Sequence, residues 1–115
     1  MTPEEVIAAI NDYEFSYTCE DDLQRAIASA LSDCSIPYQR EYQLSEKDRL
    51  DFKVGTIAIE VKIKGRLTEV ARQVGRYLQS PELTSVILVT TKSAHRNLPP
   101  SLNGKPIYVS YLPSL

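Results

Sequence analysis

The chain has 115 residues, of which 43% are hydrophobic and 24% are charged, and this is the composition of a single globular domain. Its net charge of −2 argues against a protein that coats nucleic acid by charge alone. No run approaches the roughly 18–20 apolar residues of a membrane span, and the start lacks the features of a signal peptide. The two cysteines lack metal-ligand spacing. We therefore expect one domain over 1–115, cytoplasmic, with reduced thiols and no membrane partner.

The first part of the chain predicts two helices and a strand. The opening segment TPEE has the residues of a capping box with proline at the first helical position, which predicts a short helix over 3–11. A second helix is expected over 18–32, with Thr18 as its N-cap. Glu20 lies on the apolar stripe of this helix, where it either favours the helix dipole or has a functional role. Alternation over 36–44 predicts a strand.

The second part predicts a β-hairpin, a helix and two more strands. The hairpin pairs 49–54 with 56–63, and the helix covers 67–79. The β-branched run over 84–91 is typical of a buried central strand. The last strand, over 106–112, begins with proline and is expected at a sheet edge. The order α-α-β-β-β-α-β-β predicts an α/β (α+β) domain with a mixed, largely antiparallel sheet flanked by helices.

Three charged residues of the hairpin are the most informative feature of the chain. In its second strand, alternation places the aliphatic residues on one face and Glu60 and Lys62 on the other. A two-residue turn at 54–55 would pair Asp51 with Ala58, so that Asp51 shares the face of Glu60 on the diagonal. Two carboxylates and an ammonium on one patch are costly unless something binds there, and a divalent metal ion is the obvious candidate.

This group of residues suits phosphodiester hydrolysis. The carboxylates of Asp51 and Glu60 can hold Mg²⁺ or Mn²⁺, and the backbone carbonyl of Val61 could supply another oxygen. Lys62 lies about 6–7 Å along the strand from Glu60 and can activate water and stabilise negative charge on a phosphate. The alternative interpretation is an ordinary salt bridge between Glu60 and Lys62 on a strand.

The next helix adds two candidates. Gln73 and Tyr77 are four residues apart and project from one side of a helix. Gln73 could hydrogen-bond a metal-bound water or a phosphate, and Tyr77 could pack against a sugar or phosphate. A polar helix face with an amphipathic tyrosine is the alternative. The single histidine, His95, is expected at the surface among basic neighbours.

Charge is distributed unevenly along the chain. Residues 1–46 hold ten acids and two bases, whereas residues 47–115 hold five acids and eleven bases. The bases surround the three charged hairpin residues and suggest a polyanionic partner for one face, although a solvated surface without a partner is the alternative. These bases are Lys47, Arg49, Lys53, Lys64, Arg66, Arg72 and Arg76.

Asp51…Glu60-x-Lys62 on a hairpin, followed by a helix, resembles the core of the PD-(D/E)XK nuclease superfamily. The order of elements over 18–91 also matches the restriction-endonuclease-like αβββαβ core of that superfamily. Gln73-x-x-x-Tyr77 is similar to a further motif of its RecB-like exonuclease branch. The chain departs from the pattern in two ways. Leu50 replaces the proline before the motif aspartate, and the upstream histidine of many RecB-like enzymes is missing.

The resemblance implies a role for each matching residue. Asp51 and Glu60 would bind the metal ion, Lys62 would assist catalysis, and Glu20 would be the extra acid that many members carry on the first core helix. Gln73 and Tyr77 would be accessory residues. Small stand-alone members such as Holliday-junction resolvases usually work as dimers, which makes a homodimer possible here.

Together, these observations predict a Mg²⁺-dependent deoxyribonuclease that hydrolyses phosphodiester bonds in DNA repair, recombination or phage and host DNA processing. Its main catalytic residues would be Asp51, Glu60 and Lys62, with Glu20 and Gln73 as second choices. The expected contacts with nucleic acid are Lys64, Arg66, Arg72, Arg76 and Tyr77. One alternative is a dimeric structure-selective endonuclease similar to a Holliday-junction resolvase. Another is a nuclease-fold module that binds nucleic acid or protein without cutting.

Overall fold

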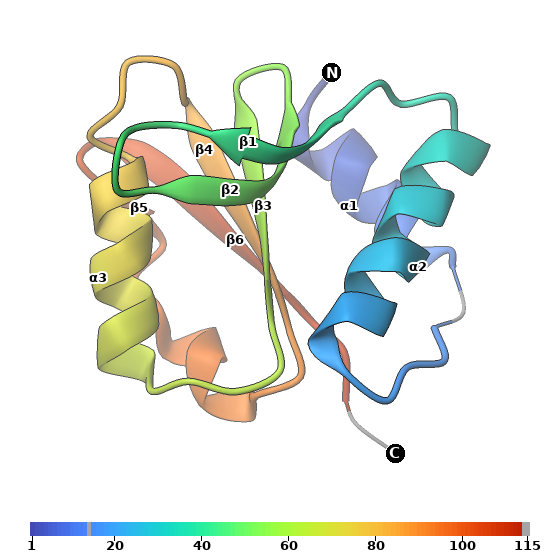
Figure 1. The fold of residues 1–115 in the computed structure, drawn as a ribbon. Coiled ribbons are helices and arrows are strands. Elements are labelled where there is room, and N and C mark those ends of the chain that lie inside the picture. The colour runs from blue at the N-terminus through green and yellow to red at the C-terminus, as the bar shows by residue number, and fades with distance from the viewer. Residues whose placement is uncertain (14, 114–115) are drawn as a thin grey trace.

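A six-stranded mixed sheet lies between two layers of helices in the computed structural model, which describes residues 1–13 and 15–113 (Figure 1). Helices α1 and α2 cover one face of the sheet, and α3 covers the other. The predicted α/β class, with a mixed sheet flanked by helices, is thus confirmed. The elements are α1 (Pro3–Asn11), α2 (Glu20–Asp33), β1 (Gln39–Gln43), β2 (Arg49–Val54), β3 (Ile57–Lys62), α3 (Leu67–Tyr77), β4 (Ser85–Thr90), the 3-10 helix η1 (Ser93–Asn97), β5 (Ser101–Leu102) and β6 (Lys105–Tyr111).

The strands lie in the order β1-β2-β3-β4-β6-β5. β1, β2 and β3 pair antiparallel, whereas β4 pairs parallel with both β3 and β6. The expected edge position of the last strand is wrong, because the two-residue strand β5 pairs with the outer side of β6. β4 is buried at all six positions, as predicted for the strand over 84–91, because helices cover both faces of the sheet there.

Alternation in β3 divides the sheet into two cores. Ile57, Ile59 and Val61 pack with α1 and α2, whereas Ala58 packs with α3. The predicted faces of this strand are therefore confirmed, and Glu60 projects to the α3 side, where Tyr77 contacts it.

The register of the β2–β3 hairpin differs from the expected one. Val54 pairs with Ile57, and Lys53 pairs with Ala58, so the turn is Gly55-Thr56 rather than 54–55. The glycine has a φ of +58°, which suits the first position of such a turn. This register places both Val54 and Ile57 in the core under α1 and α2. The predicted pairing of Asp51 with Ala58 is therefore wrong, and Asp51 comes instead to the end of the ladder, beside Glu60.

The two N-terminal helices begin differently from each other. The capping box of α1 forms as predicted between Thr2 and Glu5. Thr18 does not cap α2, whose N-cap is Cys19, because the Thr18 hydroxyl instead donates to Oδ2 of Asp22 at 2.7 Å. Within the described residues, no helix is long and apolar enough to cross a membrane.

Candidate active site

Strand β2 is irregular at Asp51. Phe52 faces the core under α1 and α2, but Leu50, two residues away, packs on the α3 side. In a regular strand these two residues would share a face. On the neighbouring strand β1, Arg40 pairs with Phe52 and Tyr42 pairs with Leu50. Glu41, which lies between these two partners, has a φ of +52° and so marks the same distortion. The strand therefore turns at Asp51 and frees its side chain from the regular pleat.

The side chains of Asp51 and Glu60 replace main-chain pairing beyond the end of the β2–β3 ladder. Oδ2 of Asp51 accepts the backbone N–H of Val61 at 2.8 Å. The backbone N–H of Asp51 donates in turn to Oε1 of Glu60 at 3.3 Å. Because the N–H and C=O of one strand residue point the same way, the Val61 carbonyl is also directed toward β2. The three expected metal ligands are thus gathered at one place.

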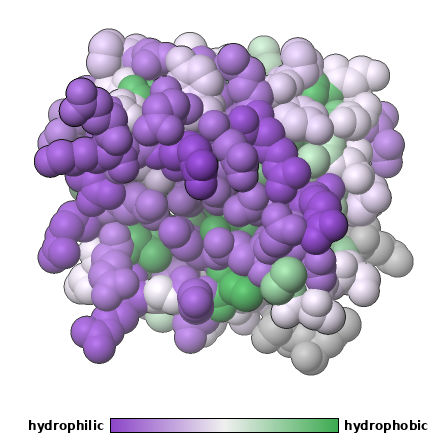
Figure 2. Space-filling view, in the orientation of Figure 1, coloured by the Kyte–Doolittle hydropathy of each residue, from purple (hydrophilic) through white to green (hydrophobic). Residues whose placement is uncertain are grey.

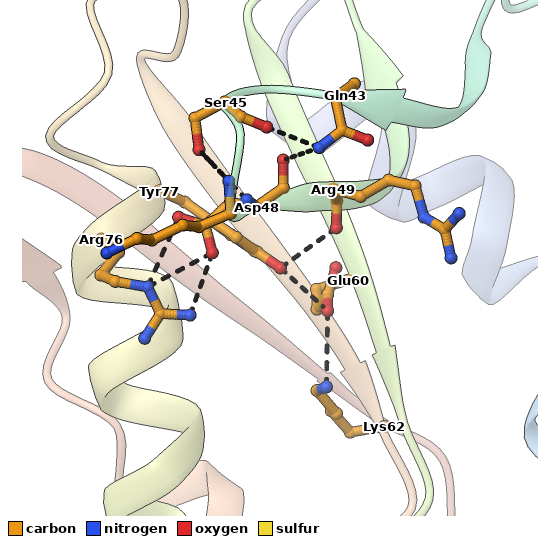
Figure 3. Close-up of polar contacts among 9 residues, drawn as sticks. Gln43, Ser45, Asp48, Arg49, Glu60, Lys62, Arg76 and Tyr77 are labelled. Atoms are coloured by element: carbon orange, nitrogen blue, oxygen red, sulfur yellow. Dashed lines mark hydrogen bonds and ion pairs between the residues drawn. The ribbon is translucent and has the colours of Figure 1, made fainter.

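Glu60 is buried, with only 3% of its surface exposed. Its Oε2 accepts the hydroxyl of Tyr77 at 3.3 Å and lies 3.4 Å from Nζ of Lys62 (Figure 3). Burial first, and then the charge of Asp51, raise the pKa of Glu60 to about 7, although the charge of Lys62 opposes the shift. Glu60 is therefore only partly ionised near neutral pH.

Asp51 has a similar environment. Its pKa is raised by burial first and then by the charge of Glu20, while the Val61 N–H and the charges of Lys62 and Arg49 lower it. Two neighbouring carboxyl groups that both resist ionisation form a site that an added cation would stabilise.

Tyr77 occupies a different position from the one expected. Its ring is fully buried in the core between α3 and the sheet, so it has no surface on which a sugar or phosphate could pack. Its hydroxyl oxygen lies 3.3 Å from Oε2 of Glu60 and 3.3 Å from the carbonyl oxygen of Arg49, so its single proton is shared between these two acceptors. Burial, first of all, raises its pKa, so the hydroxyl stays protonated and acts as a donor. Gln73, one turn earlier, is half-buried and lines the neighbouring cavity.

An open cavity of about 430 Å³ lies next to the carboxylates, and Lys62 connects the two. It brings together six of the predicted residues: Glu20, Lys62, Lys64, Arg72, Gln73 and Arg76. Gly65, Glu69 and Val70 complete the lining. Asp51 and Glu60 lie behind Lys62 and do not line the cavity. Arg66 is exposed at the N-cap of α3 and does not line it either.

Glu20 reaches this cavity from the opposite helical layer. It is the first residue of α2, and its Oε1 accepts the backbone N–H of Ile63 at 3.4 Å. This contact ties the start of α2 to the segment that follows Lys62. Glu20 thus lies close enough for its charge to act on Asp51.

The oxygen donors present fit a hard divalent cation. In the part of the chain that the structure describes, no three His, Cys, Asp or Glu side chains are close enough to hold a metal ion. The oxygen atoms that could hold a cation here are those of Asp51, Glu60 and the Val61 carbonyl. Mg²⁺ is commonly bound by one or two carboxylates and completes its shell with water and substrate phosphate, so this small set is sufficient.

His95 was expected at the surface and is instead fully buried. Its Nε2 lies 2.7 Å from the carbonyl oxygen of Gly65, and its Nδ1 lies 2.6 Å from Oγ1 of Thr90. A carbonyl only accepts, so Nε2 carries the proton and Nδ1 accepts from the threonine. The imidazole thereby holds the segment between Lys62 and α3. The sequence has no signal for this role, because the Gly65 carbonyl lies 30 positions away in the chain.

No protein-family model matches the chain, and no curated protein and no solved structure is significantly similar to it. Any function of this site is therefore inferred from the geometry of its own residues.

Proposed function

We propose that this protein is a Mg²⁺- or Mn²⁺-dependent nuclease of the PD-(D/E)XK type that hydrolyses phosphodiester bonds in DNA. The observation that carries the proposal is the convergence of the buried carboxyl group of Glu60 and the half-buried one of Asp51 behind Lys62, at the edge of a basic cavity. The αβββαβ order of elements over 18–91 supports the same assignment.

The carboxylates of Asp51 and Glu60 would hold the cation together with the Val61 carbonyl. The bound cation would supply a polarised phosphate and a water of lowered pKa. Tyr77 donates to Oε2 of Glu60 and so keeps this carboxylate in one orientation. The N–H of Val61 does the same for Asp51. Both groups are therefore preorganised before substrate arrives.

The cavity residues bind and orient the substrate. Lys62 places its ammonium between Glu60 and the cavity, where it stabilises the negative charge that develops on the phosphate. Gln73 offers an amide N–H to a phosphate oxygen or to the attacking water. Lys64, Arg72 and Arg76 supply the positive charge that a polyanion requires.

A cleavage panel tests the proposal. Linear, circular, single-stranded and branched DNA, together with RNA, would be incubated with Mn²⁺ and Mg²⁺, with EDTA as the blank. The wild type should cleave DNA only with metal present, and Lys62→Ala should lose this activity. Arg25→Gln is the control, because Arg25 is an exposed residue of α2 that does not line the cavity.

Two outcomes would change the assignment. DNA binding without cleavage by the wild type would overturn the proposal in favour of a binding module with a nuclease fold. Equal cleavage by Lys62→Ala would remove Lys62 from the mechanism. A preference for four-way junctions by a dimer would place the protein with the structure-selective endonucleases.

A further inference from the structure

A row of side chains runs from the candidate active site across three parallel strands. Lys62 on β3 pairs with Thr90 on β4, and Thr90 pairs in turn with Tyr111 on β6. Two positions before each of them lies a residue that contacts α3 or packs in the core beneath it, so alternation directs all three to the α3 side. Two strand spacings of about 4.8 Å put the Cα atoms of Lys62 and Tyr111 roughly 10 Å apart. A DNA strand with a phosphate at Lys62 can therefore place a nearby nucleotide at Tyr111.

The helix η1 covers the far end of this row. The buried imidazole of His95 fixes η1 against β4 and against the segment before α3. The next residue, Arg96, is exposed, and its Cζ lies 4.5 Å from the centre of the Tyr111 ring. Its Nε also donates to the carbonyl of Ser93 at 3.4 Å. The guanidinium is thus held against the ring on one side, and its other side is open to solvent.

Arg96 differs from the two other cations that lie over aromatic rings. Arg40 lies over one ring but pairs with Asp21. Lys53 lies over another, and its compact ammonium has no plane on which a base could stack. Among the described residues, Arg96 alone is a guanidinium that lies over a ring and has no carboxylate partner.

The surface around Arg96 is basic. Lys92, the N-cap of η1, is exposed, and so are Lys64 and Arg66 in the segment that η1 contacts. None of these four bases has an ion-pair partner among the described residues. In the same part of the chain, Met1 is the only large hydrophobic side chain that is exposed, and the face drawn in Figure 2 is largely hydrophilic, including the region over α3. Such a surface suits a polyanion better than an apolar protein partner.

A guanidinium held on an aromatic ring is a suitable surface for a nucleobase. Bases stack on guanidinium planes as they do on aromatic side chains, and every base has a face that can do so. In a duplex both faces of an internal base are covered by its neighbours, so only an unpaired or extruded base can make this contact. We infer that Arg96, seated on Tyr111, stacks with an unpaired base of the strand whose phosphate lies at Lys62. This inference rests on the proposed nuclease function for the position of that phosphate.

Fluorescence anisotropy in EDTA measures the stacking without cleavage. The probes are a single-stranded oligonucleotide and a strand of equal length in which stable abasic analogues replace every nucleotide, so that only the phosphates remain. Arg96→Lys keeps the charge and removes the plane, so it should bind the intact strand about tenfold more weakly and the abasic strand as the wild type does. The slope of log K against log salt should not change. Arg40→Lys is the matched control, because it makes the same change at an arginine over a ring on β1, at the other edge of the sheet.

A second pair of variants tests the ring beneath the guanidinium. Tyr111→Leu should weaken binding of the intact strand as Arg96→Lys does, and Tyr111→Phe should recover it. Unchanged affinity of Arg96→Lys for the intact strand would overturn the inference. An equal loss on both strands would also overturn it, because Arg96 would then contact phosphate only.

Cleavage assays with Mn²⁺ separate this inference from the proposed function. Arg96→Lys should raise KM for the intact strand about tenfold and leave KM for the abasic strand unchanged. If the wild type cleaves neither strand, the nuclease proposal fails, while the EDTA measurements still decide whether Arg96 stacks with a base. If the wild type cleaves and Arg96→Lys binds the intact strand normally, the nuclease proposal stands and the stacking is wrong.

Discussion

The hydroxyl of Tyr77 on α3 lies 3.3 Å from Oε2 of Glu60 on β3 and 3.3 Å from the carbonyl oxygen of Arg49 on β2. One buried side chain thus joins the helix to two strands directly behind the candidate active site. The ring is fully buried in the core, so packing fixes the position of the hydroxyl and, through it, the position of the Glu60 carboxylate.

Tyr77→Phe should keep the fold and loosen Glu60. The loss of one buried donor is expected to lower the free energy of unfolding by about 1 kcal/mol, which urea denaturation would measure. Cleavage should fall about 10-fold or more, since the contact orients a metal ligand. Tyr108→Phe is the matched control, because that hydroxyl contacts Glu4, far from the site. Equal losses of activity in both variants would contradict a specific role for Tyr77.

Glu60→Gln should stabilise the metal-free protein at high pH. The pKa of Glu60 is raised from 4.5 to about 7, so the folded state binds this proton more tightly than the unfolded state. Its contribution therefore favours folding at low pH and is lost as the pH rises from about 4.5 through 7. The amide has no charge to bury and should be more stable above pH 7 by up to about 3 kcal/mol.

This gain should disappear near pH 4, where the carboxyl is protonated in both states. Unfolding curves in EDTA across the pH range would measure it, with the exposed Glu46→Gln as control. A pH-independent difference between Glu60→Gln and the wild type would contradict the raised pKa.

Mg²⁺ should stabilise the wild type through the same carboxylates. At a concentration one hundred times its dissociation constant, a ligand that binds only the folded state adds about 2.7 kcal/mol. The melting temperature should therefore rise with Mg²⁺ and fall again with EDTA. Asp51→Asn and Glu60→Gln should both lose the response, whereas Glu46→Gln should keep it. A similar rise in Asp51→Asn would place the cation elsewhere.

Lys62→Ala should separate metal binding from cleavage. The ammonium stabilises charge on the substrate, so its removal should lower kcat by about 10²–10³-fold. The stabilisation by Mg²⁺ should persist, because the carboxylates and the Val61 carbonyl remain. Loss of both responses would instead indicate that Lys62 supports the carboxylates structurally.

His95 should stabilise the fold by holding the segment between Lys62 and α3. His95→Ala leaves the Gly65 carbonyl without its buried donor and opens a cavity, so the free energy of unfolding should fall by about 2–4 kcal/mol. His95→Gln keeps an N–H donor of similar reach and should recover part of this loss. Chemical denaturation of both variants would measure it, and equal stability of His95→Ala and the wild type would contradict the contact.

Local patterns predicted most of the secondary structure. The faces of β3, the amphipathic helix α3 and the buried strand β4 depend on the order of neighbouring side chains, which the sequence shows directly. The observed boundaries of the helices and strands differ from the predicted ones by a few residues. The short strand β5 was not predicted, because two residues show no periodicity.

Contacts between distant segments could not be predicted in this way. The hairpin pairing of Asp51 was wrong because the turn is Gly55-Thr56, and this choice depends on how Val54 and Ile57 share one core. Tyr77 was expected at a surface because its spacing from Gln73 shows only that both lie on one side of α3. Which of them meets the sheet depends on the angle at which the helix packs.

The sequence by itself determined that Glu60 and Lys62 share one face of a strand, because alternation is a property of the backbone. It also determined the concentration of basic residues around them. Only the tertiary structure decided that Asp51 ends the ladder beside Glu60, that Tyr77 holds Glu60 from the core, and that His95 is buried. These contacts join segments from different elements, and packing of the whole sheet and its helices sets their distances.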